Sequence, residues 1–202
     1  MHSNVEVVPV GEDESGLKRF QQVGDLVYTG DAEQRDSMRR AGAAGLAREG
    51  VRGRRSLWVA LRDGEPVARV AALMPAVGSD ADWGMLGFFE AADDPEAVSP
   101  LLGRATAWLH EQGVARAVGP MDGDTWHRYR WNLGPYDVPP FRGEPTNPPY
   151  YPRLWTDAGF QELSRYVSKR VDNVAGVVGA LRPVHARTCR NGYDFRSIRL
   201  EA

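Results

Sequence analysis

The chain of 202 residues has little cysteine, and it has no long apolar run. Its single cysteine, Cys189, excludes an internal disulfide and a cysteine-based metal cluster, and it favours a reducing cytoplasm. No apolar run approaches the roughly 20 residues that cross a membrane. The opening residues, MHSNVEVV, also lack the charged-then-apolar pattern of a secretion signal. We therefore expect a soluble, cytoplasmic protein with no membrane partner.

Lysine is scarce, and the positive charge as a whole is offset by acids. Only Lys18 and Lys169 are lysines, and 25 basic residues face 27 acidic ones, for a net charge of −2. The chain has no basic field, and its one compact basic run, VRGRR at 51–55, is short, so we expect no nucleic-acid partner. The histidines show no His-x-His or His-x-x-Glu spacing, so we expect no metal site either.

The spacing of apolar residues predicts a mixed α/β domain. Alternating or short continuous apolar runs predict strands, and apolar residues at helical spacing predict helices. The Asp63-Gly64 pair predicts the turn of a hairpin. We expect strands at 5–10, 56–61, 65–74, 85–89, 114–118, 161–171 and 195–200, and helices at 17–28, 36–49, 95–112, 152–158 and 173–181.

Residues 82–113 have the clearest pattern, and we expect the rest of the chain to be organised around them. The apolar run at 85–89 predicts a buried strand. Asp94, Pro95 and Glu96 then form a helix start signal, with an N-cap carboxylate, a proline at the first helical position and an acid in the first turn. A strand that leads into a helix start is where α/β proteins bind ligands, so we expect the functional site at this junction.

The segment 121–150 is rich in proline, glycine and aromatic residues and has no regular period. A loop of this length in a compact domain is usually functional. Its polar and aromatic cluster comprises Asp122, Asp124, Trp126, His127, Arg128, Tyr129 and Arg130. One interpretation is an acceptor pocket in which acids pair an amine and rings enclose the apolar body of that amine. The alternative is a structural loop whose charges pair with one another.

Two longer pieces resemble the GCN5-related N-acetyltransferase (GNAT) superfamily. PLLGRATAWLHEQGVARAVGP at 100–120 is similar to the family's central helix and next strand, and NPPYYPRLWTDAGFQEL at 147–163 is similar to the segment before its penultimate strand. GFFEAADDPE and GPMDGDTWHRYRW also resemble a bacterial group of GNAT-like proteins of uncharacterised substrate. The resemblance implies a GNAT-like domain at 1–171, with a mixed central sheet flanked by helices. Residues 172–202 would then complete the sheet or lead into a second domain.

The resemblance also implies an activity, the acyl-CoA-dependent N-acylation of a small amine or amino acid, with acetyl-CoA or another acyl-CoA as donor. It implies that Glu90 deprotonates the amine. In this interpretation Tyr151 would give a proton to the departing thiolate in place of a missing family tyrosine, and His127 of the loop would shuttle a proton near neutral pH. Asn147 joins the acceptor-binding cluster, although NPPYYP also fits a rigid loop. The residues that it places beside the cofactor are Leu86, Gly87, Phe88, Phe89, Ser99 and Leu101.

The segment before the central helix departs from the family pattern. The family has a glycine-rich loop there, which binds the pyrophosphate of acyl-CoA, whereas this chain has AADDPEAVS at 91–99. Three carboxylates stand where phosphate would bind, Pro95 removes one amide donor, and Trp155 stands where the family often has a tyrosine acid. Two hypotheses remain, an N-acyltransferase for a small amine and a GNAT-fold binding or homodimer-forming domain without catalysis, whose ligand would bind in the 121–147 loop.

Overall fold

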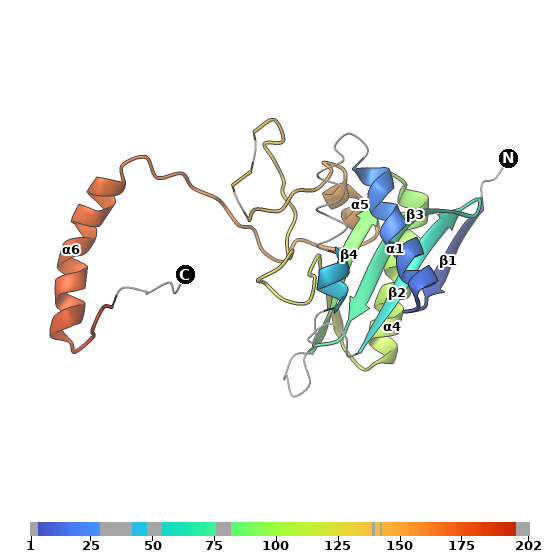
Figure 1. Cartoon of the computed structure of the whole chain (residues 1–202), viewed down its shortest axis with the longest axis horizontal. Coiled ribbons are helices and arrows are strands. Elements are labelled where there is room, and N and C mark those ends of the chain that lie inside the picture. Colours follow the sequence, from blue (N-terminus) through green and yellow to red (C-terminus); the bar gives the residue numbers. More distant parts are fainter. Residues whose placement is uncertain are drawn as a thin grey trace. The chain divides into compact units, whose positions relative to one another are not determined.

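The computed structural model of the protein describes residues 4–28, 42–47, 54–75, 82–138, 140–141 and 143–196 (Figure 1). The chain divides into two compact units, Met1–Gln161 and Glu162–Ala202, each of which is described by itself.

The first unit is built on a five-stranded sheet in the order β1-β2-β3-β4-β5. The first four strands are antiparallel neighbours, and β5 runs parallel to β4. These strands confirm five of the predicted strands. Their bounds are β1 Val5–Val10, β2 Arg55–Arg62, β3 Glu65–Leu73, β4 Trp83–Ala91 and β5 Arg116–Val118.

The hairpin between β2 and β3 turns at the predicted pair of residues. Asp63 and Gly64 both have positive φ, at 52° and 90°, which is the geometry that the tightest hairpin turn requires. The turn therefore has two residues, and Arg62 already belongs to β2 as the partner of Glu65.

Helices cover both faces of the sheet (Figure 1). One face carries α1 (Glu14–Val27), and the helical residues 42–47 contribute Leu46 to the same apolar cluster. The other face carries α4 (Pro95–Glu111), and α5 (Tyr151–Asp157) packs against α4. Asp13 caps α1 by accepting a hydrogen bond from the Gly16 amide at 2.8 Å.

Strand alternation divides the core into two clusters, one on each face. Leu57 and Val59 of β2 pack on the α1 face with Phe20, whereas Trp58 and Ala60 pack on the α4 face with Leu101. The inner strands are therefore apolar in both directions, as expected for strands that are buried on both sides. This double burial explains why their sequences read as nearly continuous apolar runs.

A bulge interrupts this alternation in β4. Arg69 pairs with Glu90 and Ala71 pairs with Gly87, so two steps along β3 correspond to three along β4. The extra residue lies next to Phe88, whose φ of 52° is unusual for a bulky side chain. After the bulge the faces are exchanged. Phe89 packs in the α4-face cluster, and Glu90 points to the other face beside Arg69.

The predicted strand at 161–171 is wrong, because this segment has no regular structure. Leu163, Tyr166 and Val167 are all exposed, at 76%, 61% and 73%. Alternation marks a segment that fits a sheet edge, but a strand forms only where an edge is available to pair with it.

The second unit contains one long helix, α6 (Val174–Arg190), which extends well beyond the predicted 173–181. Asn173 caps it by accepting a hydrogen bond from the Gly176 amide at 2.8 Å, and the helix continues through Pro183. Of the strand predicted at 195–200, residues 195–196 are not extended in a sheet, and 197–200 lie outside the described residues. Of the helix predicted at 36–49, residues 42–47 are helical and the others lie outside the described residues.

Within the described ranges, no helix combines the length and the apolar character that would let it cross a membrane.

Phe89 is the side chain on which the α4-face core should depend most. It is fully buried, and its ring makes edge contacts with Trp131, Tyr151 and Trp155 at centroid distances of 5.9, 5.0 and 5.5 Å. We expect Phe89→Ala to lower the free energy of unfolding by about 3–5 kcal/mol, measured by urea denaturation. Phe141→Ala is the control, because Phe141 is 57% exposed, and a comparable loss there would contradict this account.

Candidate functional site

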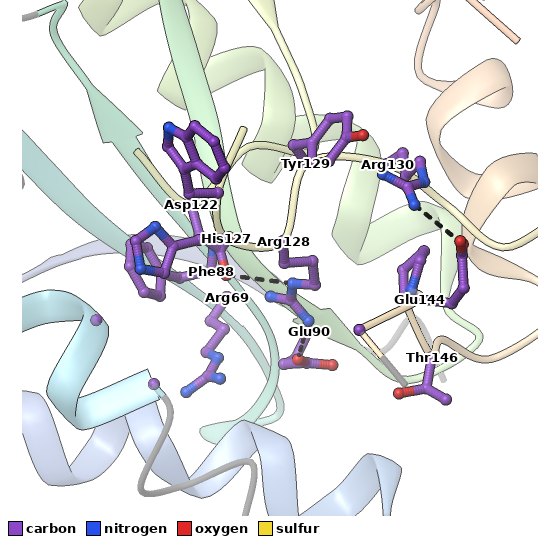
Figure 2. Close-up of a pocket in the computed structure, with 15 residues that line it drawn as sticks. Arg69, Phe88, Glu90, Asp122, His127, Arg128, Tyr129, Arg130, Glu144 and Thr146 are labelled. Atoms are coloured by element: carbon purple, nitrogen blue, oxygen red, sulfur yellow. Dashed lines mark hydrogen bonds and ion pairs between the residues drawn. The ribbon is translucent and has the colours of Figure 1, made fainter. Parts of the chain in front are cut away.

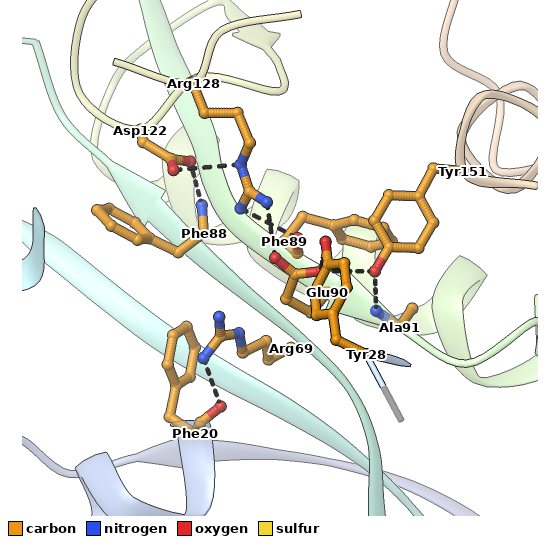
Figure 3. A network of polar contacts seen from close by, with 10 residues as sticks. All are labelled: Phe20, Tyr28, Arg69, Phe88, Phe89, Glu90, Ala91, Asp122, Arg128 and Tyr151. Carbon is orange, nitrogen blue, oxygen red and sulfur yellow. Dashed lines mark hydrogen bonds and ion pairs between the residues drawn. The ribbon is translucent and has the colours of Figure 1, made fainter. Parts of the chain in front are cut away.

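Glu90 is a buried carboxylate at the end of β4, with 1% of its surface exposed. Its Oε1 accepts a hydrogen bond from Arg128 Nη1 at 2.6 Å (Figure 3). Its Oε2 accepts hydrogen bonds from the Tyr151 and Tyr28 hydroxyls, at 2.7 Å and 3.2 Å. Three donors from three separate segments therefore compensate one charge.

The pKa values of the groups around Glu90 reflect this arrangement. Burial raises the pKa of Tyr28 and of Tyr151, and the negative charge of Glu90 raises both further, so the phenols stay protonated as donors. Burial alone would lower the pKa of Arg128, but the carboxylates of Asp122 and Glu90 raise it above its usual value. The network therefore consists of a charged pair held by neutral phenols.

Asp122 extends the network to the bulge. Its Oδ1 accepts a hydrogen bond from the Phe88 amide at 2.6 Å, and its Oδ2 lies 3.3 Å from Arg128 Nε. Arg128 in turn donates from Nη2 to the Phe89 carbonyl at 3.2 Å (Figure 3). The backbone groups that the bulge turns outward are thus bound by side chains of the 121–147 loop.

The rest of the outward edge of β4, which is the edge that faces away from β3, is bound in the same way. The Ala91 amide donates to the Tyr151 hydroxyl at 3.0 Å, and the Ala91 carbonyl accepts from the Tyr150 hydroxyl at 2.9 Å. At the other end, the Leu86 carbonyl accepts from the Met121 amide at 2.9 Å. From Leu86 to Ala91, the outward edge is therefore closed at each of these points by the chain itself.

Glycines allow this close approach. A Cβ on Gly87 would lie 2.2 Å from the Met121 carbonyl oxygen, and a Cβ on Gly119 would lie 2.7 Å from the Leu86 carbonyl oxygen. Both contacts are to backbone, which cannot move aside as a side chain can. Residues 119–122 therefore lie directly against β4.

The start of α4 is also occupied by side chains. Asp94 accepts a hydrogen bond from the Ala97 amide at 3.1 Å, and Arg62 binds both carboxylate oxygens of Asp94 at 2.6 Å. This pairing holds the pKa of Asp94 below its usual value. Glu96 contacts Arg62 as well, at 3.2 Å, and Arg153 pairs with Asp93. An anion at this helix start would meet carboxylates instead of free amides.

A cavity of about 290 Å³ lies beside the network, between the bulge, the helical residues 42–47 and the loop (Figure 2). Its walls combine charged side chains with aromatic rings. The lining residues are Gly42, Gly45, Arg69, Phe88, Glu90, Asp122, Trp126, His127, Arg128, Tyr129, Arg130, Gly143, Glu144, Pro145 and Thr146. Their convergence from distant parts of the sequence makes this cavity the candidate binding site.

The loop positions its polar side chains through internal contacts. Asp124 Oδ1 accepts hydrogen bonds from the His127 amide at 3.1 Å and lies 2.6 Å from His127 Nδ1. Arg130 binds Glu144 at 3.0 Å across the loop. These charged side chains of the loop therefore pair with one another, as the second interpretation of the loop expects.

Arg69 differs from the other charged residues of the cavity. Its side chain enters from β3 and is 6% exposed, and Nη1 donates to the Phe20 carbonyl at 2.9 Å. The guanidinium also stacks 4.9 Å from the centre of the Phe20 ring. Its Nε has no hydrogen-bond partner among the described residues. Burial lowers the pKa of Arg69, although the nearby charge of Glu90 acts against this effect.

The structure brings many of the predicted site residues together and separates others. Glu90, Phe88, Asp122, Trp126, His127, Arg128, Tyr129 and Arg130 all line the cavity. Leu86 and Leu101 are fully buried in the α4-face core, with Phe89 among their cluster. Ser99 is exposed on α4, and the Asn147 side chain bridges to the backbone of Asn132. Tyr151 is fully buried and reaches the site through its hydroxyl alone.

Sequence reasoning missed Arg69, Tyr28, Glu144 and Thr146. Arg69 did carry a signal, because it is the one charged residue inside the apolar run VARVAAL of β3. A charge in a strand that is apolar in both directions must be buried with a partner or must face a cavity. Tyr28 is the last residue of the predicted helix at 17–28, and no sequence pattern indicates that its hydroxyl contacts Glu90, which is 62 residues away in the chain.

Among the residues that the structure describes, no group of three or more histidine, cysteine or acidic side chains is placed to hold a metal ion.

Comparison with known proteins identifies the fold. A putative acetyl transferase from Pyrococcus furiosus superposes with a TM-score of 0.50, at 14% sequence identity, over 83% of this chain and 100% of that one. The fold is that of the GNAT acetyltransferases. An aminoglycoside N-acetyltransferase, AAC(6')-Iy in complex with CoA, superposes with a TM-score of 0.48 at 13% identity, over 85% and 97% of the two chains.

No family model matches the sequence. Protein YghO of Escherichia coli (strain K12) is 31% identical over 97 residues, which cover 46% of this chain and 25% of that protein. The match thus spans about a quarter of the length of this curated relative.

The residues present do not fit acyl-CoA in the way that the GNAT resemblance implies. The pantetheine arm would need the backbone edge of β4 after Leu86, but Asp122, Arg128, Tyr150 and Tyr151 bind that edge. The pyrophosphate would need free amides at the start of α4, but the Ala97 amide already donates to Asp94 and Pro95 has no amide hydrogen. The same fold therefore presents a closed edge where the cofactor would lie.

The buried phenols predict a loss of stability at high pH. Burial raises the pKa of Tyr150 to about 12 and raises that of Tyr28 and Tyr151 too, so the folded protein keeps protons that the unfolded chain releases above about pH 10. This stabilisation is complete below about pH 10 and declines as the pH rises, by up to about 1.4 kcal/mol per pH unit for each of the buried phenols of Tyr28 and Tyr151 and by less for the partly exposed Tyr150.

Urea denaturation at increasing pH, with tyrosinate absorbance recorded in parallel, measures this effect. Tyr28→Phe should reduce the slope of stability against pH, because one of the protons is removed. Tyr193→Phe should not change it, because Tyr193 is 68% exposed. Equal slopes for the wild type and Tyr28→Phe would contradict the prediction.

Proposed function

We propose that this chain is a small-molecule-binding domain on the GNAT fold, and that it binds its ligand in the cavity beside Glu90 without using acyl-CoA. The observation that carries the proposal is the closed outward edge of β4, together with the open cavity next to it. A fold fixes where a site can lie but does not fix its chemistry.

The role of Glu90 supports binding over catalysis. A general base must reach the proton that it removes, with a lone pair directed to the substrate. Glu90 Oε2 already accepts two hydrogen bonds, from Tyr151 and Tyr28, and Oε1 accepts one from Arg128, so a substrate proton would have to share an oxygen with these donors. Likewise the Tyr151 hydroxyl donates to Glu90 and accepts from the Ala91 amide, which leaves it no proton for a thiolate.

The second candidate is the N-acyltransferase for a small amine or amino acid. Its support is the fold itself, since the chain covers the whole of a putative acetyl transferase at a TM-score of 0.50. This candidate would require Asp122 to leave the Phe88 amide, which would then serve as the oxyanion donor. It would also require Asp94 to yield the start of α4.

Calorimetric titration with acetyl-CoA and with free CoA distinguishes the two candidates. We expect no saturable heat from either compound, because the amides that would bind them are already hydrogen-bonded to Asp122 and Asp94. Saturable binding with a dissociation constant in the micromolar range would overturn the proposal and would support the acyltransferase.

A thermal-shift screen with small amines, amino acids, carboxylates, phosphates and sugars tests the cavity itself. A ligand that binds the folded state alone raises the melting temperature in a concentration-dependent way. Thr146→Phe should abolish the stabilisation, because it fills the cavity from an exposed position on its wall. Thr156→Phe is the matched control on the exposed surface of α5. Stabilisation that survives in Thr146→Phe would place the ligand elsewhere.

A further inference from the structure

We propose that the ligand of this cavity carries an anionic group, a carboxylate or a phosphate, and that the guanidinium of Arg69 binds it. This inference rests on the proposed function, because it names the chemistry of the molecule that the cavity takes.

Arg69 has unused hydrogen-bonding capacity in a buried position. A guanidinium carries five N–H donors in a fixed plane. Among the described residues, the Arg69 guanidinium makes one hydrogen bond, from Nη1 to the Phe20 carbonyl, and its Nε has no partner. A buried charge with so few partners is costly, so a further acceptor would be strongly favoured here.

The acids of the cavity are already matched to other cations. Glu90 and Asp122 both pair with Arg128, and Glu144 pairs with Arg130. By contrast, Arg69 forms no ion pair with a carboxylate in the part of the chain that the structure describes. An amine would therefore meet acids that are compensated and one cation that is not. The uncompensated positive charge of Arg69 would repel that amine but attract an anion, so the electrostatics favour an anion.

The space next to Arg69 is left open by glycines. A Cβ on Gly24 of α1 or on Gly42 would each lie 3.8 Å from Arg69 Nη2, so side chains at these positions would cover that nitrogen. Both positions lack a side chain. In Figure 3 the guanidinium lies between Glu90 and Phe20, and Figure 2 places it among the residues that line the cavity. Nη2 is thus the donor that faces the space these glycines leave, and the buried Nε is the neighbouring donor without a partner among the described residues.

The geometry of a guanidinium selects the kind of anion. Its two parallel N–H groups match two oxygens of one carboxylate or phosphate, and such bidentate pairs are stronger than neutral hydrogen bonds. Nearby rings of Trp126 and Tyr129 and the polar groups of Thr146 would contact the remainder of the molecule. The ligand class is therefore a small carboxylate or phosphate with an apolar or aromatic part.

The test compares anions at matched ionic strength in a thermal-shift titration. The probes are sodium phosphate and sodium acetate, with sodium chloride as the salt control and tetramethylammonium chloride as the cation control. The variants are Arg69→Met and, as a matched control, Arg165→Met in the second unit, where Arg165 is exposed and pairs with Glu162. Methionine keeps the volume of the buried stem, and replacement of a buried charge by an apolar group is often tolerated.

We expect phosphate or acetate to raise the melting temperature saturably in the wild type and in Arg165→Met. In Arg69→Met the apparent dissociation constant should weaken at least about tenfold, which corresponds to about 1.4 kcal/mol. Equal stabilisation in Arg69→Met and the wild type would overturn the inference. So would the absence of anion stabilisation in the wild type, or stabilisation by tetramethylammonium alone.

A measurement on the wild type keeps the inference testable if Arg69→Met does not fold. The Nε–H signal of Arg69 can be followed by proton–nitrogen NMR, after assignment through bonds, during titration with phosphate. Saturable displacement of this signal, with the Arg165 signal unmoved, is the expected result. A stationary Arg69 signal would overturn the inference.

The two proposals fail in different ways. A ligand whose effect is lost in Thr146→Phe but retained in Arg69→Met would leave the proposed function standing and refute the anionic group. Anion binding that depends on Arg69, together with saturable binding of acetyl-CoA in the calorimetric titration, would do the opposite: the anion site would stand, and the proposal that the chain does not use acyl-CoA would fall.

Discussion

The structure depends on the compensation of one buried carboxylate. Glu90 lies at the end of a strand that is apolar on both sides, and an unpaired charge there would cost several kcal/mol. Its partners come from three distant segments: Tyr28 follows α1, Arg128 belongs to the long loop, and Tyr151 begins α5. The network therefore does more than stabilise a charge. It attaches the end of α1, the loop and α5 to the same point of β4, and so defines the walls of the cavity.

The same contacts explain how a common fold can change its use. The resemblance to acetyltransferases implies that the outward edge of β4 receives a cofactor, but here Asp122 and the two neighbouring tyrosines bind that edge. Each contact satisfies a backbone group that would otherwise be left unpaired. Under the proposed function, the sheet, the helices and their order stay the same while the ligand binds in the cavity beside Glu90. The start of α4 is bound by the chain in the same way, since Asp94 caps the helix and places a carboxylate where an anion would bind.

Short sequence patterns predicted the turns and helix ends that depend on a few adjacent residues. The turn at Asp63-Gly64 and the start of α4 at Pro95 were predictable because backbone geometry and capping depend on a few adjacent residues. The segment 161–171 was mispredicted because alternation does not reveal whether a partner strand exists. At the site, the loop cluster around Arg128 was predictable from its composition, but the burial of Glu90 was not. The bulge at Phe88 decides which face Glu90 occupies, and its one signal in the sequence is Gly87, which also fits a close backbone approach without a bulge.

The bulge makes the length of β4 as important as its composition. If β4 kept its length but followed a regular pleat after Gly87, the residues beyond Gly87 would exchange faces. The carboxylate of Glu90 would then enter the apolar layer under α4, and the ring of Phe89 would enter the charged cavity. Deletion of Phe88 would instead remove the extra residue and leave Phe89 and Glu90 on their present faces, but it would also remove one aromatic ring from the cavity wall. The extra residue of the bulge therefore sets which of two adjacent side chains, Phe89 or Glu90, faces the charged cavity beside Arg69.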